Sequence, residues 1–397
     1  MIVIVSPWYG PDTVGGAETQ ARGLAQALHR IGVPVTVWAG TARDSFHAAE
    51  QNYYPAGSGK LDGVPLWRFQ PTPTDPRGVP PFFQRLPARL PPLNSFATHE
   101  LRLHSTLLSS DELYAAIQAA PAATRFIFMP YPFPTTFWGA LIAPERSFLL
   151  PCLHDEAYAY YSTYRYLFNQ VRGVLANSHA EADLVRRLYG LPDARIHVPG
   201  EGISLTPRGD GAHFRQAWGL NGTARPDLLL YVGRRDESKN IAHLLAFPRE
   251  YWARRGRPLR LLLAGQGELN LPAGAGALIH DLGYLDEQAK HDAYAAADLF
   301  VHPSIYESFS IVLMEAWLQG TPALVNGACA VTSDHCRRSG GGLLFHDFGS
   351  FAAALDLLLP QAELRHALGA RGRDYVLNTC KWEDVARRTA DAVLGST

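Results

Sequence analysis

The residues best suited to chemistry lie in the segment 306–315. Glu307 and Glu315 flank a short run in which a buried strand is expected to turn into a helix. The first turn of such a helix presents unpaired N–H groups and the positive end of the helix dipole, which together bind anions. A diphosphate over residues 308–311 would place hydroxyl groups beside each carboxylate, as in a nucleotide sugar. The alternative interpretation is that both glutamates are solvated surface residues with no ligand, since charged residues mostly lie on surfaces.

Two cations in the segment YVGRRDESKN (231–240) are expected near the same ligand. The segment follows an apolar run typical of a strand, so Gly233 would end that strand and Arg234 and Lys239 would lie in the loop. Loops at the carboxyl ends of parallel strands are where open α/β sheets bind ligands. Arginine can hold two phosphate oxygens and lysine adds a point charge, so the pair could stabilise a departing diphosphate without metal. Surface ion pairs with neighbouring acids are the alternative interpretation.

Two segments in the first half of the chain could face such a ligand. Gly15 and Gly16 stand at the start of the first expected helix, where bare backbone lets a pyrophosphate approach or simply permits a sharp turn. His154 follows a strand that ends near Pro151, where it could hydrogen-bond a sugar hydroxyl or serve as a structural histidine. The glycine spacing lacks the Gly-x-Gly-x-x-Gly pattern, which disfavours a nicotinamide oxidoreductase.

These residues are positioned by two series of short apolar runs that alternate with segments of helical period, the pattern of parallel sheets with crossover helices. Strands are expected at 2–5, 34–39, 126–129, 147–150, 173–177 and 195–198, and in the second series at 227–232, 259–265, 277–283, 298–303 and 321–326. A stretch rich in proline and glycine separates the two series. The expected domains are residues 1–205 and 206–375, and residues 376–397 would form a helix that crosses back to the first domain.

Residues 65–95 interrupt the first series. Nine prolines in this stretch argue against a regular helix or a central strand, so a long loop is expected. Its aromatic and arginine side chains could contact an acceptor, a partner or a membrane surface. Burial of the aromatic residues under an ordinary surface loop is the alternative.

Composition limits the class of protein. The 397 residues are 47% hydrophobic and 18% charged, which is typical of a folded protein with two domains. A formal net charge of -1 provides no global field for nucleic acid or an anionic bilayer, so an anionic ligand needs a local cluster. The four cysteines lack the spacing of zinc sites or disulfide frameworks. Neither a signal peptide nor a membrane-spanning run is recognised, and a cytoplasmic location is expected.

Together these segments resemble glycosyltransferase family 4, retaining enzymes of the glycosyl transferases group 1 type. The matching segments are VGGAE (14–18), CLHDE (152–156), VLANSHAEADLV (174–185), VPGEGIS (198–204), VGRRDESKN (232–240), GYLDEQ (283–288), AADLFVHPS (296–304) and ESFSIVLMEA (307–316). The specific part is two glutamates with seven residues between them, joined to Gly-Arg followed five residues later by Lys. The family often has glycine at the positions of Ser308 and Ser310, and Asn-Gly-x-Asp at residues 201–204.

The resemblance implies the α/β GT-B architecture, in which two Rossmann-like domains with doubly wound parallel sheets face each other across a cleft. The implied catalytic residues are His154, Arg234, Lys239 and Glu307. The implied donor-binding residues are Gly15, Gly16, Gly233, Arg234, Lys239, Tyr284, Leu285, Glu307, Ser308, Phe309, Ser310, Ile311 and Glu315. In this scheme the two cations bind the diphosphate, Glu307 binds the transferred sugar, Glu315 binds the ribose, and the backbone at 284–285 holds the base.

The implied reaction moves a hexosyl-type sugar from a UDP- or GDP-linked donor to the hydroxyl of a sugar, a lipid-linked molecule or a small molecule. It would proceed with retention, without metal or another cofactor, in polysaccharide, glycolipid or glycoconjugate synthesis. The same contacts would serve a nucleotide-sugar epimerase, a sugar phosphorylase or a non-catalytic sugar-nucleotide-binding protein. Nucleic acid is not an expected partner, and a peripheral contact with the inner face of a membrane would run through residues 65–95.

Overall fold

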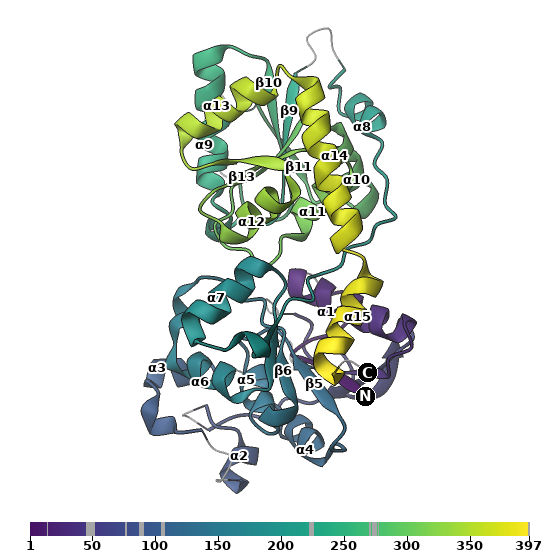
Figure 1. Cartoon of the computed structure of the whole chain (residues 1–397), viewed down its shortest axis with the longest axis vertical. Coiled ribbons are helices and arrows are strands. Elements are labelled where there is room, and N and C mark those ends of the chain that lie inside the picture. The colour runs from purple at the N-terminus through teal and green to yellow at the C-terminus, as the bar shows by residue number, and fades with distance from the viewer. Residues whose placement is uncertain are drawn as a thin grey trace. The chain divides into compact units, whose positions relative to one another are not determined.

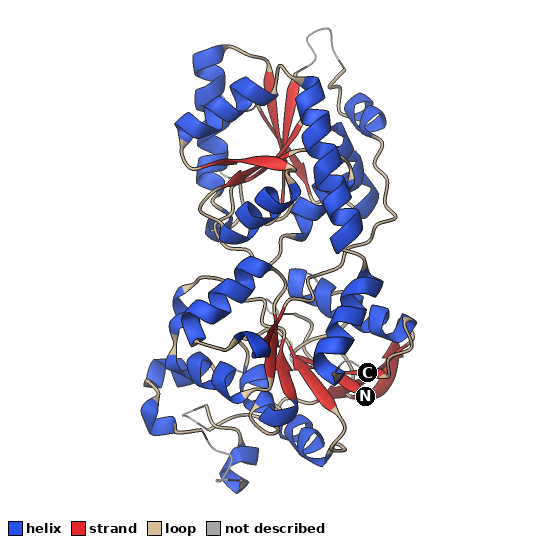
Figure 2. Ribbon diagram, viewed as in Figure 1, coloured by secondary structure: helices blue, strands red, loops and turns tan. Residues whose placement is uncertain are grey.

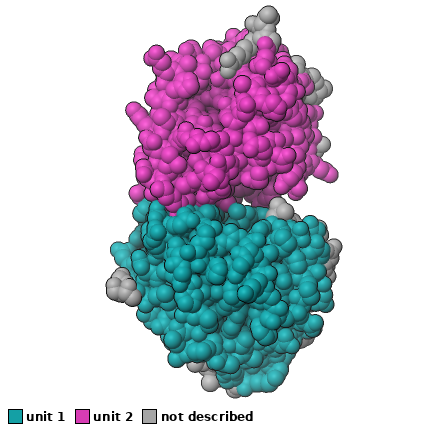
Figure 3. All heavy atoms as spheres, turned by 90° about the vertical axis from the view of Figure 1, so that its right-hand side faces the viewer, with its two compact units in different colours: residues 1–202, 382–397 teal, residues 203–381 magenta. Residues whose placement is uncertain are grey.

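The computed structural model describes residues 1–13, 15–44, 52–75, 78–86, 91–104, 108–221, 226–269, 271, 276 and 278–395. The chain divides into two compact units (Figure 3). Unit 1 comprises residues 1–202 and 382–397, and unit 2 comprises residues 203–381. Each unit is a parallel sheet with helices on both faces (Figure 2), so the doubly wound α/β class predicted from sequence is confirmed.

The sheet of unit 1 has the order β3-β4-β2-β1-β5-β6-β7-β8. Its strands are β1 (Ile2–Ser6), β2 (Val35–Gly40), β3 (Gly57–Leu61), β4 (Val64–Phe69), β5 (Arg125–Phe128), β6 (Ser147–Leu149), β7 (Gly173–Leu175) and β8 (Ile196–His197). All neighbours pair in parallel except the β3–β4 hairpin. The central strand β1 is buried along its whole length, as expected for a strand covered on both faces.

The expectation of an irregular loop over residues 65–95 is wrong at its start. Residues 65–69 belong to β4, which pairs with β2 on one side and β3 on the other. Pro65 is tolerated because the ladder with β2 begins only at Leu66, so the missing N–H of the proline is not needed there. Further along, the short helix α2 (Pro81–Arg85) buries Phe82 and Phe83 in the core.

The helices of unit 1 enclose one core on each face of the sheet. They are α1 (Gly16–Arg30), α2, α3 (Thr98–Arg102), α4 (Asp111–Ala119), α5 (Pro134–Ala140), α6 (Ser162–Gln170), α7 (His179–Tyr189) and α15 (Trp382–Leu394). The C-terminal helix α15 lies along α1 (Figure 1), and its Ala386, Ala390 and Val393 share a core with Leu24. Residues 376–381, which were assigned to this helix from sequence, instead belong to unit 2.

The sheet of unit 2 has the order β11-β10-β9-β12-β13-β14, and every pair is parallel. Its strands are β9 (Asp227–Val232), β10 (Leu259–Ala264), β11 (Ile279–Gly283), β12 (Leu299–His302), β13 (Ala323–Asn326) and β14 (Gly342–Phe345). Its helices are α8 (Gly211–Ala217), α9 (Ile241–Arg255), α10 (Glu287–Ala296), α11 (Ile311–Leu318), α12 (Ala330–Ser339), α13 (Phe348–Leu358) and α14 (Ala362–Thr379).

The strand order of unit 2 reverses between β9 and β12, which are neighbours in the sheet. Ligands of open α/β sheets bind beyond the carboxyl ends of the strands at such a reversal. Strand β9 ends at Val232 and β12 ends at His302, so the loops that follow them start side by side. Among the described residues, no helix has the length and apolar character needed to cross a membrane.

Candidate functional site

The first part of the site is the loop that follows β9. Gly233 has a φ of 154°, a conformation that favours glycine. The Tyr231 hydroxyl donates to the Arg234 carbonyl oxygen at 2.5 Å and fixes the loop where it leaves the sheet. The Arg234 side chain is exposed, and its Nε lies 3.5 Å from Asp236 Oδ2. An exposed ion pair of this kind contributes little stability, so a phosphate could replace the carboxylate.

Lys239 lies in the same loop and is paired with one of the two predicted carboxylates. Its Nζ donates to Glu307 Oε1 at 2.6 Å, and the two side chains are 17% and 12% exposed. Burial alone would raise the pKa of Glu307, but the Lys239 ammonium, together with smaller effects of His302 and Ser304, lowers that pKa to about 2. The structure therefore brings together a cation and an anion that the sequence placed on separate loops.

His302 lies beside this pair and was missed by the sequence analysis. The residue ends β12, is 2% exposed, and has its Nε2 2.8 Å from Ser310 Oγ and 3.4 Å from Glu307 Oε1. Burial lowers the pKa of His302 to about 4, although the Glu307 carboxylate opposes this shift. The ring is neutral near pH 7. The available signal was a histidine at the carboxyl end of a buried strand, five residues before Glu307.

The helix expected to receive an anion is α11. It begins at Ile311, with Ser310 as its N-cap. The first backbone N–H groups of the helix lack intrahelical partners, and the Ser310 side chain does not cap them. Phe309 is 4% exposed and packs in the core below the turn, while Ser308 is partly exposed. This turn offers N–H donors within two residues of Glu307.

Glu315 lies on α11 and has its own lysine. Its Oε1 accepts from Lys290 Nζ at 2.8 Å, and its Oε2 accepts from the Tyr294 hydroxyl at 3.1 Å. Burial raises the pKa of Glu315, although both donors favour the anion. Lys290 and Tyr294 were not predicted as site residues. They are four residues apart on α10, and that spacing places both on one face of the helix.

One group of side chains in unit 2 has the donor types of a metal site. Glu287, His291 and Glu315 each offer an atom within 4.8 Å of the others. Lys290 Nζ lies 2.9 Å from Glu287 and 2.8 Å from Glu315, so one ammonium already lies between the two carboxylates. The His291 Nδ1 is engaged with Gln319 Nε2 at 3.0 Å. The arrangement therefore fits a lysine-centred ion pair better than a divalent cation.

Tyr284 and Leu285 follow β11, two strands from β9. Gly283 ends the strand, Tyr284 is 69% exposed and Leu285 packs against the core of unit 2. The Tyr284 ring is exposed to solvent, whereas Leu285 anchors the loop. The two residues thus lie at the carboxyl edge that also carries the loops of Arg234 and Glu307.

The predicted residues of the first half lie at the carboxyl edge of the unit 1 sheet. Gly15 is the N-cap of α1 with a φ of 147°, and Gly16 begins the helix with open space where a side chain would be. The φ of Gly15 favours glycine, and an added Cβ would lie 2.2 Å from Glu18 Oε2, so that side chain would have to move. Val14, the first residue of the VGGAE motif, lies outside the described residues. Both glycines are exposed, as an approaching ligand would require.

His154 follows β6 in a loop whose preceding residue, Leu153, is bound by a buried carboxylate that the sequence analysis missed. The backbone N–H groups of Leu153 and Asn177 each donate to a Glu181 oxygen at 2.5 Å, and Glu181 is 1% exposed. Burial raises the pKa of Glu181 to about 8, against the effect of these two donors. His154 itself is 33% exposed in its side chain, with Nδ1 3.8 Å from Glu156 Oε1. Glu181 fixes the loop, and the histidine stays accessible.

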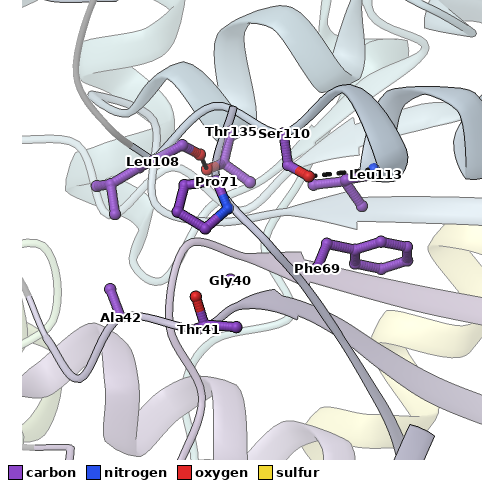
Figure 4. A pocket seen from close by; sticks show the side chains of 9 residues that line it. All are labelled: Gly40, Thr41, Ala42, Phe69, Pro71, Leu108, Ser110, Leu113 and Thr135. Atoms are coloured by element: carbon purple, nitrogen blue, oxygen red, sulfur yellow. Dashed lines mark hydrogen bonds between the residues drawn. The ribbon is translucent and has the colours of Figure 1, made fainter. Parts of the chain in front are cut away.

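A hollow in unit 1 involves none of these residues (Figure 4). It lies at the carboxyl ends of β2 and β4 and is lined by Gly40, Thr41, Ala42, Phe69, Pro71, Leu108, Ser110, Leu113 and Thr135. The Thr135 hydroxyl donates to the Leu108 carbonyl at 2.6 Å, and the Ser110 hydroxyl accepts from Leu113 N–H at 3.4 Å. The third hydroxyl of the lining, that of Thr41, donates to Asn52 Oδ1 at 3.3 Å. All three polar side chains serve the fold, so we assign no ligand to this hollow.

Two family models match the chain. The glycosyl transferases group 1 model matches residues 215–375, and the glycosyltransferase family 4 model matches residues 14–207. The chain belongs to this glycosyltransferase family, as the resemblance of its motifs predicted.

Relatives and solved structures agree with this assignment. D-inositol 3-phosphate glycosyltransferase 2 of Catenulispora acidiphila is 32% identical over 243 residues, 55% of each chain, so the match spans about half the length of this curated relative. Sucrose-phosphate synthase from Thermosynechococcus elongatus superposes with a TM-score of 0.69 at 20% identity, covering 98% of this chain and 97% of that one. Anabaena HepE, solved in complex with UDP, gives 0.67 at 15% identity and 99% of both chains. The GT-B fold is thereby confirmed.

Proposed function

We propose that this chain is a retaining glycosyltransferase that moves a hexosyl-type sugar from a UDP- or GDP-linked donor to a hydroxyl acceptor without a metal ion. The observation that carries the proposal is the Lys239–Glu307 pair, 2.6 Å apart, beside the open first turn of α11. The pair combines an ammonium for phosphate with a carboxylate for sugar hydroxyls. Family membership and a solved neighbour in complex with UDP support a nucleotide-linked donor.

The proposed step needs no protein nucleophile. The bond between the sugar C1 and the β-phosphate oxygen breaks, and a bond from C1 to the acceptor oxygen forms on the same face. The acceptor proton passes to the departing phosphate oxygen. Arg234, Lys239 and the N–H groups of α11 stabilise the negative charge that develops on the diphosphate, while Glu307 holds the sugar hydroxyls. In this scheme Lys239 exchanges its contact with Glu307 for a phosphate oxygen when the donor binds.

A two-part experiment tests the proposal. Thermal shifts with uridine, guanosine and adenosine diphosphates, with and without a chelator, identify the base, because a ligand that binds only the folded state raises the melting temperature. Labelled donor and candidate acceptors then give a product whose anomeric configuration is read by NMR. Transfer that requires added metal, or a product with inverted configuration, would contradict the corresponding part of the proposal. Free epimer or sugar phosphate as the product would point to the two related enzyme classes.

A double variant, Arg234→Ala with Lys239→Ala, tests the assigned residues. We expect turnover to fall by on the order of 10³-fold or more, since each cation is assigned to leaving-group charge. The fold should survive, because the exposed pair of Arg234 with Asp236 is weak and the loss of Lys239 should cost only about 1 to 3 kcal/mol. Unchanged sugar transfer by the double variant would contradict the assignment of Arg234 and Lys239 to the leaving diphosphate.

We also propose the cytoplasm as the place of this reaction, with a peripheral membrane contact through residues 65–95 when the acceptor is lipid-linked. Trp67 is 47% exposed in this stretch, and the side chain of Arg85 is 75% exposed. Cosedimentation of the chain with vesicles of anionic lipid, compared with the variant Trp67→Ala, tests this contact. Equal sedimentation of both proteins would assign Trp67 to the protein surface alone.

A further inference from the structure

Ser310 is an unusual N-cap. A serine at this position ordinarily has extended backbone and accepts a hydrogen bond from the first helical turn. Ser310 instead has φ 75° and ψ 73°, makes no side-chain cap, and is 5% exposed. Glycine adopts this left-handed conformation without strain, whereas serine does not. The Ser310 side chain therefore destabilises the start of α11 without capping it. We expect this side chain to have another function.

The hydroxyl of Ser310 is bound by the neighbouring histidine. His302 Nε2 lies 2.8 Å from Ser310 Oγ, and the other ring nitrogen, Nδ1, is buried without a partner. A neutral imidazole carries one hydrogen, on Nε2 or on Nδ1. A hydrogen on Nδ1 would leave a buried donor unpaired and would turn the Nε2 lone pair toward Glu307 Oε1 at 3.4 Å. The hydrogen therefore sits on Nε2, and burial, which lowers the pKa of His302 to about 4, keeps the ring neutral.

This tautomer of His302 determines whether the Ser310 hydroxyl donates or accepts in the hydrogen bond between them. With Nε2–H donating, Ser310 Oγ is the acceptor of the bond and its own hydrogen is left for another acceptor. Among the described residues, Ser310 Oγ has no second hydrogen-bond partner. Its neighbours at the helix start are the unpaired N–H groups of the first turn, which attract an anion. The oxygen of a bound phosphate would provide the acceptor that the hydroxyl lacks.

We propose that His302 orients the Ser310 hydroxyl as an additional hydrogen-bond donor to the leaving diphosphate. This inference rests on the proposed function and refines it. Ser310 touches the leaving group and keeps its own proton, while His302 is a positioning residue that acts through Ser310. A glycine at this position would offer the backbone N–H alone. The chain would thus replace a strain-free glycine with a side chain that strengthens binding of the diphosphate as its charge develops.

Binding measurements separate this role from a structural one. Calorimetry compares a nucleoside diphosphate with the matching monophosphate, in the uridine and guanosine series, on the wild type and on Ser310→Ala. We expect the variant to bind the diphosphate about 10-fold more weakly, as loss of one hydrogen bond to a charged group would cause, and the monophosphate almost unchanged. Equal effects on both ligands, or no effect on either, would overturn the inference. If the wild type itself bound no nucleoside diphosphate, the proposed function would fail as well.

Turnover of a small set of variants tests the histidine and the strain. Ser310→Gly removes the hydroxyl and the strained backbone together, whereas Ser310→Ala removes only the hydroxyl. We expect kcat to fall by roughly 10- to 100-fold in both, although the glycine variant should melt at the higher temperature. His302→Leu should lower kcat by a similar factor, and His302→Gln should recover part of this loss, because its amide N–H can still donate to Ser310. The kcat of the double variant His302→Leu with Ser310→Ala should be no lower than that of either single variant. A wild-type kcat in Ser310→Gly, or additive losses of kcat in the double variant, would contradict the proposal that His302 acts through the Ser310 hydroxyl.

Discussion

The carboxyl edges of the two sheets hold their carboxylates in different ways. In unit 2 each predicted glutamate faces a lysine, at 2.6 Å for Glu307 and 2.8 Å for Glu315. In unit 1 the buried Glu181 accepts instead from two backbone N–H groups. A side-chain partner can turn away and be replaced by a ligand, whereas a backbone donor cannot leave without moving the chain. The difference indicates that Glu307 and Glu315 can exchange partners, whereas Glu181 holds its loops in place.

The largest effect on turnover should follow from breaking the Lys239–Glu307 ion pair of unit 2. Lys239→Met removes the charge proposed to stabilise the leaving group, so we expect kcat to fall by about 10²- to 10³-fold. The same change leaves Glu307 without its ammonium and should cost about 1 to 3 kcal/mol of stability, less than for a fully buried pair. Steady-state kinetics and chemical denaturation measure the two effects.

Two further variants sharpen this prediction. Lys239→Met with Glu307→Gln should be more stable than Lys239→Met alone, because no unpaired charge remains. Lys60→Met, a matched change at an exposed lysine of the β3–β4 hairpin, should alter neither turnover nor stability appreciably. If the double variant were less stable than Lys239→Met alone, the unpaired Glu307 carboxylate would not be the cause of the lost stability.

Sequence patterns predicted the unit 2 edge better than the unit 1 edge, and the comparison explains why. Arg234, Lys239, Glu307 and Glu315 are charged side chains at fixed spacing after strands, which a pattern can register. Glu181 was not recognised because its partners are backbone N–H groups 28 and 4 residues away, and sequence does not show them. His302 was missed for a related reason, since its partner Ser310 is identified only by the turn geometry.

The fold was predicted closely where strands are apolar and central. All eleven predicted strands agree with the structure within two residues at each end, because buried parallel strands form continuous apolar runs. Strands β3 and β4 were missed because their glycines and Pro65 resemble a turn. Strand β14 was missed because it begins with Gly342 after two further glycines. In both cases tertiary pairing overrides a weak local preference.

The next largest effect tests the backbone-held carboxylate of unit 1. Glu181→Ala removes the acceptor of two buried N–H groups, so we expect a loss of about 2 to 4 kcal/mol. Hydrogen exchange should accelerate at the amides of Leu153 and Asn177, and the loop of His154 should lose its support. Amides of β9 and β12 in unit 2 serve as the internal control. Unchanged protection at Leu153 and Asn177 would contradict the assigned role.

Glu181 in unit 1 and the His302–Glu307 pair in unit 2 should contribute to stability with opposite pH dependence. The pKa of Glu181 is raised from 4.5 to about 8, so the folded chain keeps a proton that the unfolded chain releases, and stability falls as pH rises between these values. The pKa of His302 is lowered from 6.5 to about 4 and that of Glu307 from 4.5 to about 2, so the stability that these two groups give to unit 2 is lost as pH falls. Each group contributes up to about 1.4 kcal/mol per pH unit.

Hydrogen exchange at pH 5, 7 and 8.5, corrected for the intrinsic exchange rate, reports the two units separately. Glu181→Gln should flatten the alkaline loss of protection in unit 1 and leave unit 2 unchanged. His302→Gln should flatten the acid loss in unit 2 and leave unit 1 unchanged. Protection that changes in the same direction in both units would show that the two kinds of carboxylate environment do not differ as the contacts imply.

The smallest effect is expected at Tyr284, whose ring is 69% exposed. Replacement by alanine removes few packing contacts, so stability should change by less than about 0.5 kcal/mol. If the backbone at residues 284–285 holds the base, the KM for the donor should change by less than about threefold, because the N–H and C=O groups remain. KM measured with UDP- and GDP-linked donors checks this, with Leu285→Ala as the companion variant that loosens the loop. A rise of tenfold or more for one base alone would assign base recognition to the tyrosine ring, making this edge of unit 2 selective through a side chain as well as through its ion pairs.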